Sequence, residues 1–194
     1  MTNRLEAAAS TRRALLDAAA ALLDGGGPAA VTLREVGAIA GVTRGAPYRH
    51  FPDKENLLTE VAAEGWDRLG QAMHALRANP QLIPGERLRA ALTAILLVAR
   101  RQPHLYQLMF TAPHGDPEAV VRAAQRMCDE FLDLVAPVVG PQNAERSAAI
   151  LLTGVHGAAG LASSGLLVTD KWHTTADDLV DTLLDVVMEI DRPG

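Results

Sequence analysis

The stretch from Val31 to Val61 constrains the fold of this chain more than any other. It reads V-T-L-R-E-V-G-A-I-A-G-V-T-R-G-A-P-Y-R-H-F-P-D-K-E-N-L-L-T-E-V. Thr32 and Glu35 have the spacing of a helix capping box, and Gly41 stands where that helix must stop, a place suited to a left-handed residue. The pattern predicts two short helices joined by a tight turn, followed by the start of a longer helix.

The second short helix has a composition that is wrong for a buried element. It combines two arginines, a tyrosine and a histidine with small residues: Arg44, Gly45, Ala46, Tyr48, Arg49 and His50. A short basic helix with small side chains can enter the major groove of DNA, with Arg44 at its N-terminal end near the base edges. This segment is therefore the candidate DNA-binding helix.

The ends of this helix and of the next one follow from their capping residues. We expect Thr43 to cap the basic helix, which would leave Pro47 in the first turn, where little hydrogen bonding is lost. Asp53 is expected to cap the longer helix. Lys54 would then lie beside free backbone N–H groups. A lysine at a helix N-terminus can form a binding site for a DNA phosphate.

The run T-L-R-E-V-G-A-I-A-G-V-T-R-G-A-P-Y-R-H-F-P-D-K-E-N-L-L resembles the N-terminal helix-turn-helix of the TetR/AcrR family of bacterial transcriptional regulators. In that family the helix equivalent to 43–50 enters the major groove. The resemblance implies base-facing positions at Thr43, Arg44, Gly45 and Ala46, and phosphate contacts from Thr32, Tyr48, His50 and Lys54, with Arg49 completing the expected DNA-binding set. Pro47 departs from the family pattern, which more often has a larger apolar residue there.

Composition points to an all-α fold. Hydrophobic residues make up 48% of the chain and aromatic residues only 4%, so the core must be aliphatic, and alanine and leucine lead the scale of helix propensity. The single cysteine, Cys128, cannot form an intramolecular disulfide, which suits a reducing cytosol. The N-terminus lacks the apolar core of a signal peptide, so a cytoplasmic location is expected.

The net charge of −5 at first argues against binding to DNA. However, residues 1–60 hold seven Lys/Arg and seven Asp/Glu, and the remaining residues hold eleven and sixteen. The basic groups of the first part cluster at Arg12–Arg13 and between Arg44 and Lys54. Local clustering on one face, and not total charge, sets the field that attracts phosphates, so the charge pattern permits DNA binding.

Apolar periodicity predicts several further helices. They are expected at 11–24, from Asp53 to about Leu76, at about 86–101, from Asp116 to about Val138, with Val121 and Cys128 inward, and at the C-terminus after a Thr175 cap. We place a domain boundary within the long helix, giving a helix-turn-helix domain at 1–60 and an effector-binding and dimerisation domain at 61–194. Arg12 and Arg13 could touch the DNA backbone or lie on a solvated face.

The stretch 147–169 carries no formal charge. A membrane span is rejected, because the stretch contains four glycines, a histidine and several hydroxyls and lacks a basic flank. Its small residues allow another helix to approach closely. The family resemblance implies that the stretches 145–168 and 175–191 form a four-helix interface in a homodimer, and V-H-G at 155–157 resembles the W-H-G signature of one C-terminal subgroup.

The same resemblance implies a small-molecule effector site in the C-terminal domain. Methionine, aromatic and histidine side chains could line this effector site: Trp66, His104, Tyr106, Met109, Phe110, Met127, Phe131 and His156. For each apolar member the ordinary interpretation is a core residue, and Tyr106, His104 and His156 are the stronger candidates, because a buried polar group needs a partner. His156 could instead bond a backbone carbonyl or face its mate at the dimer axis.

No constellation of catalytic or metal-ligating residues is visible. Cys128 has no histidine nearby in sequence, no H-E-x-x-H spacing occurs, and the glycines at 25–27 lack the lysine of a phosphate loop. We therefore expect no enzyme, cofactor or metal. The expected function is a ligand-responsive, dimeric regulator, with repression implied by resemblance, that binds a double-stranded palindromic operator. The alternative is a ligand-binding or dimeric interaction protein with vestigial DNA contacts.

Overall fold

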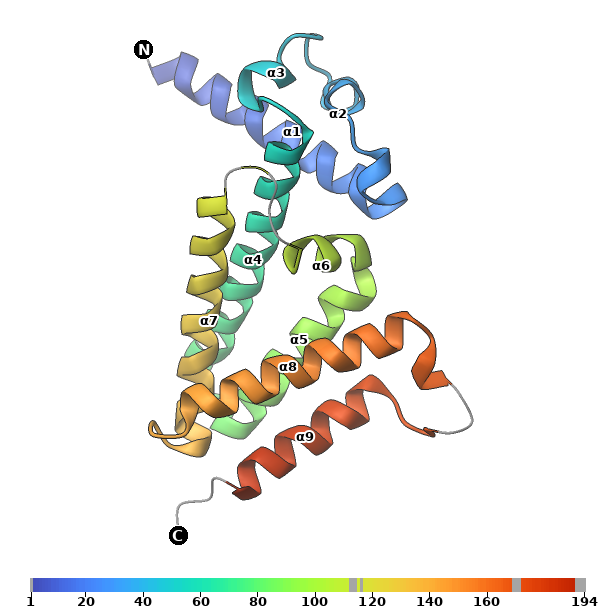
Figure 1. The fold of residues 1–194 in the computed structure, drawn as a ribbon. Helices are drawn as coiled ribbons and strands as arrows, with labels where there is room; N and C mark the ends of the chain where they lie inside the picture. Colours follow the sequence, from blue (N-terminus) through green and yellow to red (C-terminus); the bar gives the residue numbers. More distant parts are fainter. Residues whose placement is uncertain (1, 112–114, 116, 169–171, 191–194) are drawn as a thin grey trace. The chain divides into compact units, whose positions relative to one another are not determined.

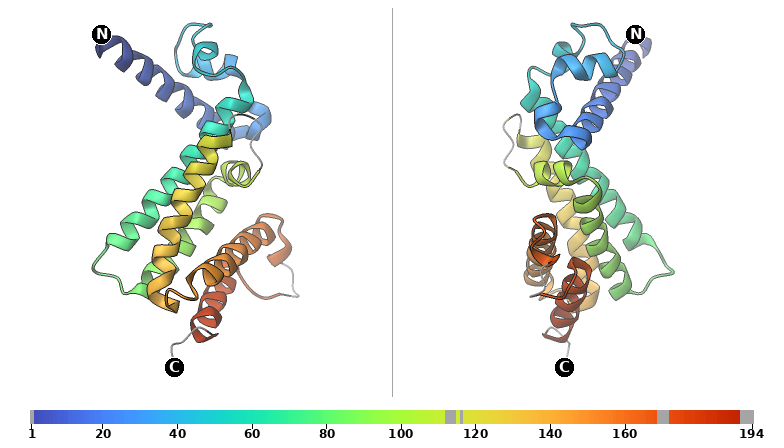
Figure 2. Two further views of the ribbon diagram at one scale, coloured as in Figure 1. Left: turned by 60° about the vertical axis from the view of Figure 1, so that its left-hand side comes forward. Right: turned by 90° about the vertical axis from the view of Figure 1, so that its right-hand side faces the viewer.

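The computed structural model describes residues 2–111, 115, 117–168 and 172–190. These residues form helices joined by turns, with no strand among them, which confirms the all-α prediction (Figures 1 and 2). No helix among them is long and apolar enough to span a membrane. The chain divides into two compact units, the first made of residues 1–66 and 104–123 and the second of residues 67–103 and 124–194.

The first unit is built around three N-terminal helices. They are α1 (Thr2–Ala30), α2 (Leu33–Ile39) and α3 (Pro47–His50), joined by the first part of α4 (Lys54–Ala78), by α6 (Pro103–Met109) and by the start of α7 (Pro117–Val139). Helix α1 starts nine residues earlier than the predicted 11–24 helix. It loses helical geometry at Gly27, where φ is 67° and ψ is −172°, within the glycine run expected to end it.

Helix α2 begins and ends as its sequence predicts. The backbone N–H of Glu35 donates to the Thr32 hydroxyl at 3.2 Å. The Glu35 carboxylate accepts from the same hydroxyl at 2.6 Å, and not from the Thr32 backbone N–H as expected. At the other end Gly41 has a φ of 67°, and the N–H of Val42 reaches back to the carbonyl of Gly37 at 3.1 Å. This is the left-handed stop that glycine accommodates.

Helix α3 corrects the expected position of the DNA-binding helix. It begins at Pro47 and not after Thr43, because Pro47 has no N–H to give the Thr43 carbonyl, and the N–H of Ala46 takes that carbonyl at 2.9 Å in a turn. Pro47 is buried as the first residue of α3, where its missing donor costs nothing. A β-carbon on Gly37 would come within 2.7 Å of the Pro47 ring, so this glycine lets α2 and α3 pack closely.

Arg12 and Arg13 are paired within the first unit. Arg12 forms an ion pair with Glu60 and lies 5.3 Å from the centroid of the Phe51 ring. Arg13 lies 2.8 Å from Glu64. Both arginines therefore join α1 to α4, an arrangement that the sequence pattern did not indicate.

The second unit contains the rest of α4 and α7 and three further helices. These are α5 (Pro84–Arg101), α8 (Ala144–Ser163) and α9 (Ala176–Ile190), with a short 3-10 turn at Leu166–Val168. Helices α8 and α9 run side by side and both contact α5 (Figure 1). A β-carbon on Gly154 of α8 would overlap Leu183 of α9, so this small residue does allow close helix packing. Thr175 caps α9 through the N–H of Asp178 at 3.1 Å, as predicted.

Helix α7 differs from its prediction at Val121. Val121 was predicted to face inward but is exposed, because α7 turns the neighbouring Val120 and Ala123 into the core instead. Asp116, the predicted cap of that helix, lies outside the described residues. The boundary between residues 60 and 61 stays a prediction. By contacts, α6 groups with the N-terminal helices although it follows α5 in the chain.

Candidate nucleic-acid interface and ligand cavity

The residues predicted to contact DNA lie at the surface of α2, α3 and the turn between them. Thr43, Arg44, Gly45 and Arg49 are exposed, and Tyr48 keeps 58% of its surface accessible. Ala46 and His50 are half-buried, and Thr32 is exposed with its hydroxyl bonded to Glu35. Arg44, Tyr48 and Arg49 therefore have side chains that are open to solvent, as contact with a duplex requires.

A hollow of about 400 Å³ lies between α2 and α3. The exposed residues Arg34, Arg44 and Tyr48 line it, together with the buried Gly37 and Pro47. Sequence reasoning missed Arg34. The signal that could have found it is its position in α2, beside buried Leu33 and four residues before exposed Ala38, on the side of the helix away from the core. Two guanidinium groups and a phenol thus border one concave surface.

The basic side chains of this region have no acidic partner among the residues that the structure describes. Within the described part of the chain, Arg34, Arg44, Arg49 and Lys54 form no ion pair. Of the arginines elsewhere, seven are paired with carboxylates: Arg12, Arg13, Arg77, Arg89, Arg100, Arg122 and Arg126. Arg68, Arg87 and Arg101 also form no ion pair within the residues that the structure describes, but they are not grouped around one hollow. Unpaired cations on a solvent-exposed surface are available to neutralise phosphates.

Lys54 is the first residue of α4, and Asp53 caps this helix as predicted. The N–H of Asn56 donates to Asp53 Oδ1 at 2.8 Å, and the Asn56 side-chain amide donates to the same oxygen at 2.9 Å. These hydrogen bonds, the backbone one first, lower the pKa of Asp53 below its ordinary value. Lys54 is half-buried, because one side of it borders a second concave site.

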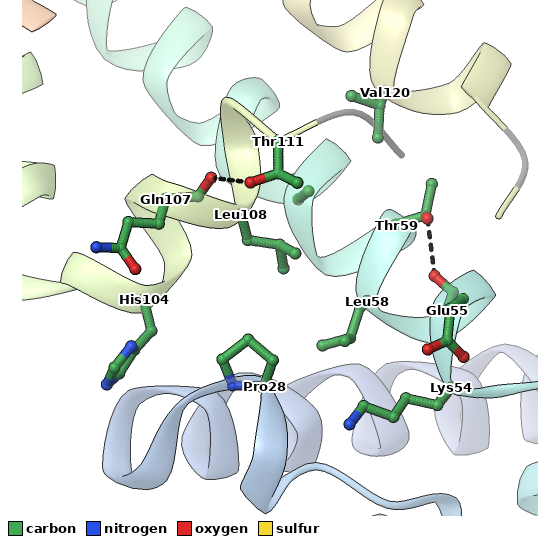
Figure 3. A pocket seen from close by; sticks show the side chains of 11 residues that line it. Pro28, Lys54, Glu55, Leu58, Thr59, His104, Gln107, Leu108, Thr111 and Val120 are labelled. Atoms are coloured by element: carbon green, nitrogen blue, oxygen red, sulfur yellow. Dashed lines mark hydrogen bonds between the residues drawn. The ribbon is translucent and has the colours of Figure 1, made fainter. Parts of the chain in front are cut away.

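We call this second site the α4 cavity. It has a volume of about 310 Å³ and lies wholly within the first unit. Its lining residues come from α1, α4, α6 and α7 (Figure 3): Pro28, Lys54, Glu55, Leu58, Thr59, Ala62, His104, Gln107, Leu108, Thr111 and Val120. This volume is at the lower end of the range of small-molecule sites.

Only one of the eight predicted effector residues, His104, lines the α4 cavity. Trp66 is buried, and its indole N–H donates to the carbonyl of Met109 at 3.1 Å. The Phe110 ring lies 4.9 Å from the Trp66 ring and 4.9 Å from the Tyr106 ring. Burial raises the pKa of Tyr106 to about 12. These residues form an aromatic core in the first unit, so their burial needs no ligand.

The other three predicted effector residues belong to the second unit. Met127 and Phe131 are buried on α7, and His156 is exposed on α8. The structure thus does not gather the eight residues around the α4 cavity, because the side chains sort between two separate cores. A ligand role for Met127, Phe131 and His156 stays a prediction.

Two family descriptions match this sequence. Bacterial regulatory proteins, tetR family, matches residues 15–61, and Tetracyclin repressor-like, C-terminal domain, matches residues 88–187. The chain belongs to the tetR family of bacterial regulatory proteins. The first match covers α2 and α3, so the tetR helix-turn-helix contains the hollow that Arg34, Arg44 and Tyr48 border. The expectation of a transcriptional regulator rather than an enzyme is confirmed by this membership.

Two curated relatives are transcriptional regulators. The HTH-type transcriptional regulator AcrR of Shigella flexneri is 33% identical over 133 residues, 66% of this chain and 62% of AcrR. The HTH-type transcriptional repressor KstR of Rhodococcus jostii is 35% identical over 101 residues, 52% of this chain and 46% of KstR. In these matches the chain spans less than two thirds of either relative.

A solved structure shares the fold of most of this chain. It is a protein of unknown function from Rhodococcus sp. RHA1, 28% identical to this chain, with a TM-score of 0.79 over 94% of this chain and 96% of that one. The similarity extends through both matched tetR segments.

Proposed function

We propose that this tetR-family protein is a ligand-responsive regulator that binds a palindromic operator as a homodimer and represses transcription. The observation that carries the proposal is the concave surface between α2 and α3, where Arg34, Arg44 and Tyr48 are exposed and have no acidic partner in the described part of the chain. A surface of this kind can hold phosphates on either side of a groove while a short helix contacts base edges. The proposal that it represses rests on the family resemblance, and the relative KstR is named as a repressor.

The exposed face of α8 supports dimerisation. Its exposed positions recur at three- and four-residue spacing without a charged group between Ala149 and Leu161: Ala149, Ile150, Thr153, His156, Gly157, Gly160 and Leu161. Ile150 is 44% exposed and Leu161 43% exposed. Apolar side chains gathered on one helix face favour burial against another protein surface. If a second copy packs through the same face, a two-fold axis relates the two DNA-binding units. A palindromic operator has the same two-fold symmetry.

The α4 cavity supports response to a small molecule. It combines an apolar floor with a few polar groups, as small-molecule sites do. A ligand changes DNA affinity only through its difference in affinity for the DNA-bound and free states.

The DNA-binding proposal is tested with the paired substitution Arg44→Ala and Tyr48→Ala. We would first map the DNA that the protein protects upstream of its own gene, then measure gel-shift affinity over a range of salt concentrations. Loss of a phosphate contact lowers the slope of log affinity against log salt by about 0.9. Arg122→Ala, which removes an exposed arginine from α7, is the matched control. Affinity that is unchanged in the double variant and insensitive to salt would instead favour a dimeric ligand-binding protein with vestigial DNA contacts.

A further inference from the structure

The α4 cavity has an apolar middle and two polar ends. Figure 3 shows Pro28, Leu58 and Leu108 around its centre. The α6 side presents His104 and Gln107, and the α4 side presents Lys54 and Glu55. A molecule that fills this space would therefore need an apolar body with a polar group at each end.

The polar groups at the two ends are available to a ligand. Among the residues that the structure describes, no side-chain hydrogen bond or ion pair engages four of them: Lys54, Glu55, His104 and Gln107. The two threonine hydroxyls of the cavity are already used as donors, from Thr59 to the Glu55 carbonyl at 2.7 Å and from Thr111 to the Gln107 carbonyl at 2.8 Å. Lys54 and His104 are half-buried, and a bound molecule can supply the hydrogen-bond partner that each lacks. Glu55 and Gln107 are exposed, so a ligand there would replace water.

The charges of the lining indicate a neutral ligand. Lys54 contributes a positive charge and Glu55 a negative charge, and the two are adjacent in the first turn of α4. A strongly charged ligand would be attracted by one and repelled by the other, so it would gain little. A hydroxyl or amide group can accept from the Lys54 ammonium and donate to the Glu55 carboxylate without a net charge.

We propose that the α4 cavity binds a small neutral amphipathic molecule with hydroxyl or amide groups at its ends, and that this molecule competes with DNA for Lys54. The inference rests on the proposed function, because it needs Lys54 to hold a phosphate. Figure 3 shows the Lys54 side chain extended along the cavity, on the side of Pro28. One ammonium group cannot fully serve a ligand in the cavity and a phosphate outside it. Ligand and DNA therefore weaken each other by the same factor.

Binding in the cavity is tested with 4-hydroxybenzamide, which is neutral, planar and polar at both ends. Titration of the full-length protein, followed by two-dimensional amide NMR, is expected to shift resonances of the cavity residues. Leu108→Trp fills the cavity and should abolish these shifts. Gln107→Ala leaves the fold intact because its side chain is exposed, and should weaken binding severalfold. If the probe is raised to millimolar concentration and no resonance of these residues shifts, the cavity is not the binding site that we propose.

Competition is tested by measuring operator affinity with and without the same probe. In the unmodified protein, adding the probe should lower the affinity for the operator. The Lys54→Gln substitution should itself lower operator affinity in the absence of the probe, and should reduce the slope of log affinity against log salt by about 0.9 per protomer. The probe should then have no further effect on the variant. Arg122→Gln, with the same loss of charge on α7, should keep the full response.

Two results would separate the failure of this inference from failure of the proposed function. If the probe binds by NMR while the protein has no salt-dependent affinity for its operator, the proposed function is wrong and competition for Lys54 is wrong with it. If the protein binds DNA and the probe binds the cavity, but DNA affinity is equal with and without the probe, only the competition is overturned.

Discussion

The imidazole ring of His104 lies against Gly27, so closely that a β-carbon on that glycine would come within 3.2 Å of the ring. Gly27 ends the regular part of α1, and His104 is the second residue of α6. Helix α6 also lies close to α4, because a β-carbon on Gly65 of α4 would come within 2.8 Å of the Met109 sulfur. Helix α6 thus packs against α1 and α4, and this places the α4 cavity within the unit that contains the helix-turn-helix.

The Gly27 contact predicts a position that tolerates no side chain. Its backbone, with φ of 67° and ψ of −172°, lies in a region that essentially only glycine occupies. We expect Gly27→Ala to lower the free energy of unfolding by about 1–3 kcal/mol, measured by urea denaturation. Gly25→Ala is the control, because it is helical with open space around it, and it should raise stability by about 0.5–1 kcal/mol. Equal effects of the two substitutions would contradict the assigned strain.

The hydrogen bond from Trp66 to the Met109 carbonyl predicts a second stability effect. Trp66→Phe keeps an aromatic ring but leaves a buried carbonyl without its donor, which should cost about 1–3 kcal/mol. Trp172→Phe alters an exposed indole and should be nearly neutral. Both are measured by denaturation followed by circular dichroism. A neutral Trp66→Phe variant would show that the hydrogen bond contributes no net stability.

The Glu130 carboxylate predicts a pH dependence in the second unit. Hydrogen bonds from Arg77 above all, and from His74, lower its pKa below its ordinary value. A lowered folded-state pKa means that the stabilisation is present above the ordinary glutamate pKa and is lost as pH falls towards the depressed value. Glu130→Gln should therefore destabilise the protein near neutral pH, by less than about 1 kcal/mol for a pair this near the surface, and by progressively less in acid.

The control for Glu130 is Asp133→Asn. Asp133 is more exposed and lies 3.7 Å from the same guanidinium, so its removal should change stability little at any pH. Unfolding free energies of both variants and the unmodified protein are compared between neutral and acidic pH. A stability difference for Glu130→Gln that grows in acid has the wrong sign and would refute the ion-pair explanation.

The uncharged face of α8 predicts sensitivity to a buried charge. In the proposed dimer, Ile150→Glu would place a carboxylate in an apolar interface, where an unpaired charge costs about 3–5 kcal/mol. We expect sedimentation velocity to show a monomer for this variant and a dimer for the unmodified protein. Val121→Glu, which changes an equally exposed apolar residue on α7, should remain dimeric. A dimer that survives Ile150→Glu would place the interface elsewhere.

Arg34 predicts a DNA contact that the sequence pattern did not reveal. Because it borders the same hollow as Arg44 and has no acidic partner among the described residues, Arg34→Ala should weaken operator binding and lower the salt slope by about 0.9 per protomer. Uniform weakening across operator variants would assign Arg34 to phosphate, whereas loss of preference at one base pair would assign it to a base edge. Unchanged affinity and slope would remove it from the interface.

Local signals predicted some features correctly and failed at others, among them the start of α1, the start of α3 and the orientation of Val121. Thr32, Gly41 and Thr175 begin or end helices as expected, since a cap is decided by groups three to five residues apart. The start of α3 was predicted too early. The error was also local, because a helix capped by Thr43 would have needed the N–H that Pro47 lacks.

The sequence by itself determined the helical class, most helix ends and the family, because propensity, capping and motif spacing act within a few residues. Only the tertiary structure decided which distant groups meet. It paired Arg12 with Glu60, placed His104 against Gly27, and buried Trp66 beside Met109. These contacts join residues that are tens of positions apart, and they depend on how all the helices of a unit pack together. No periodicity within one helix specifies that packing.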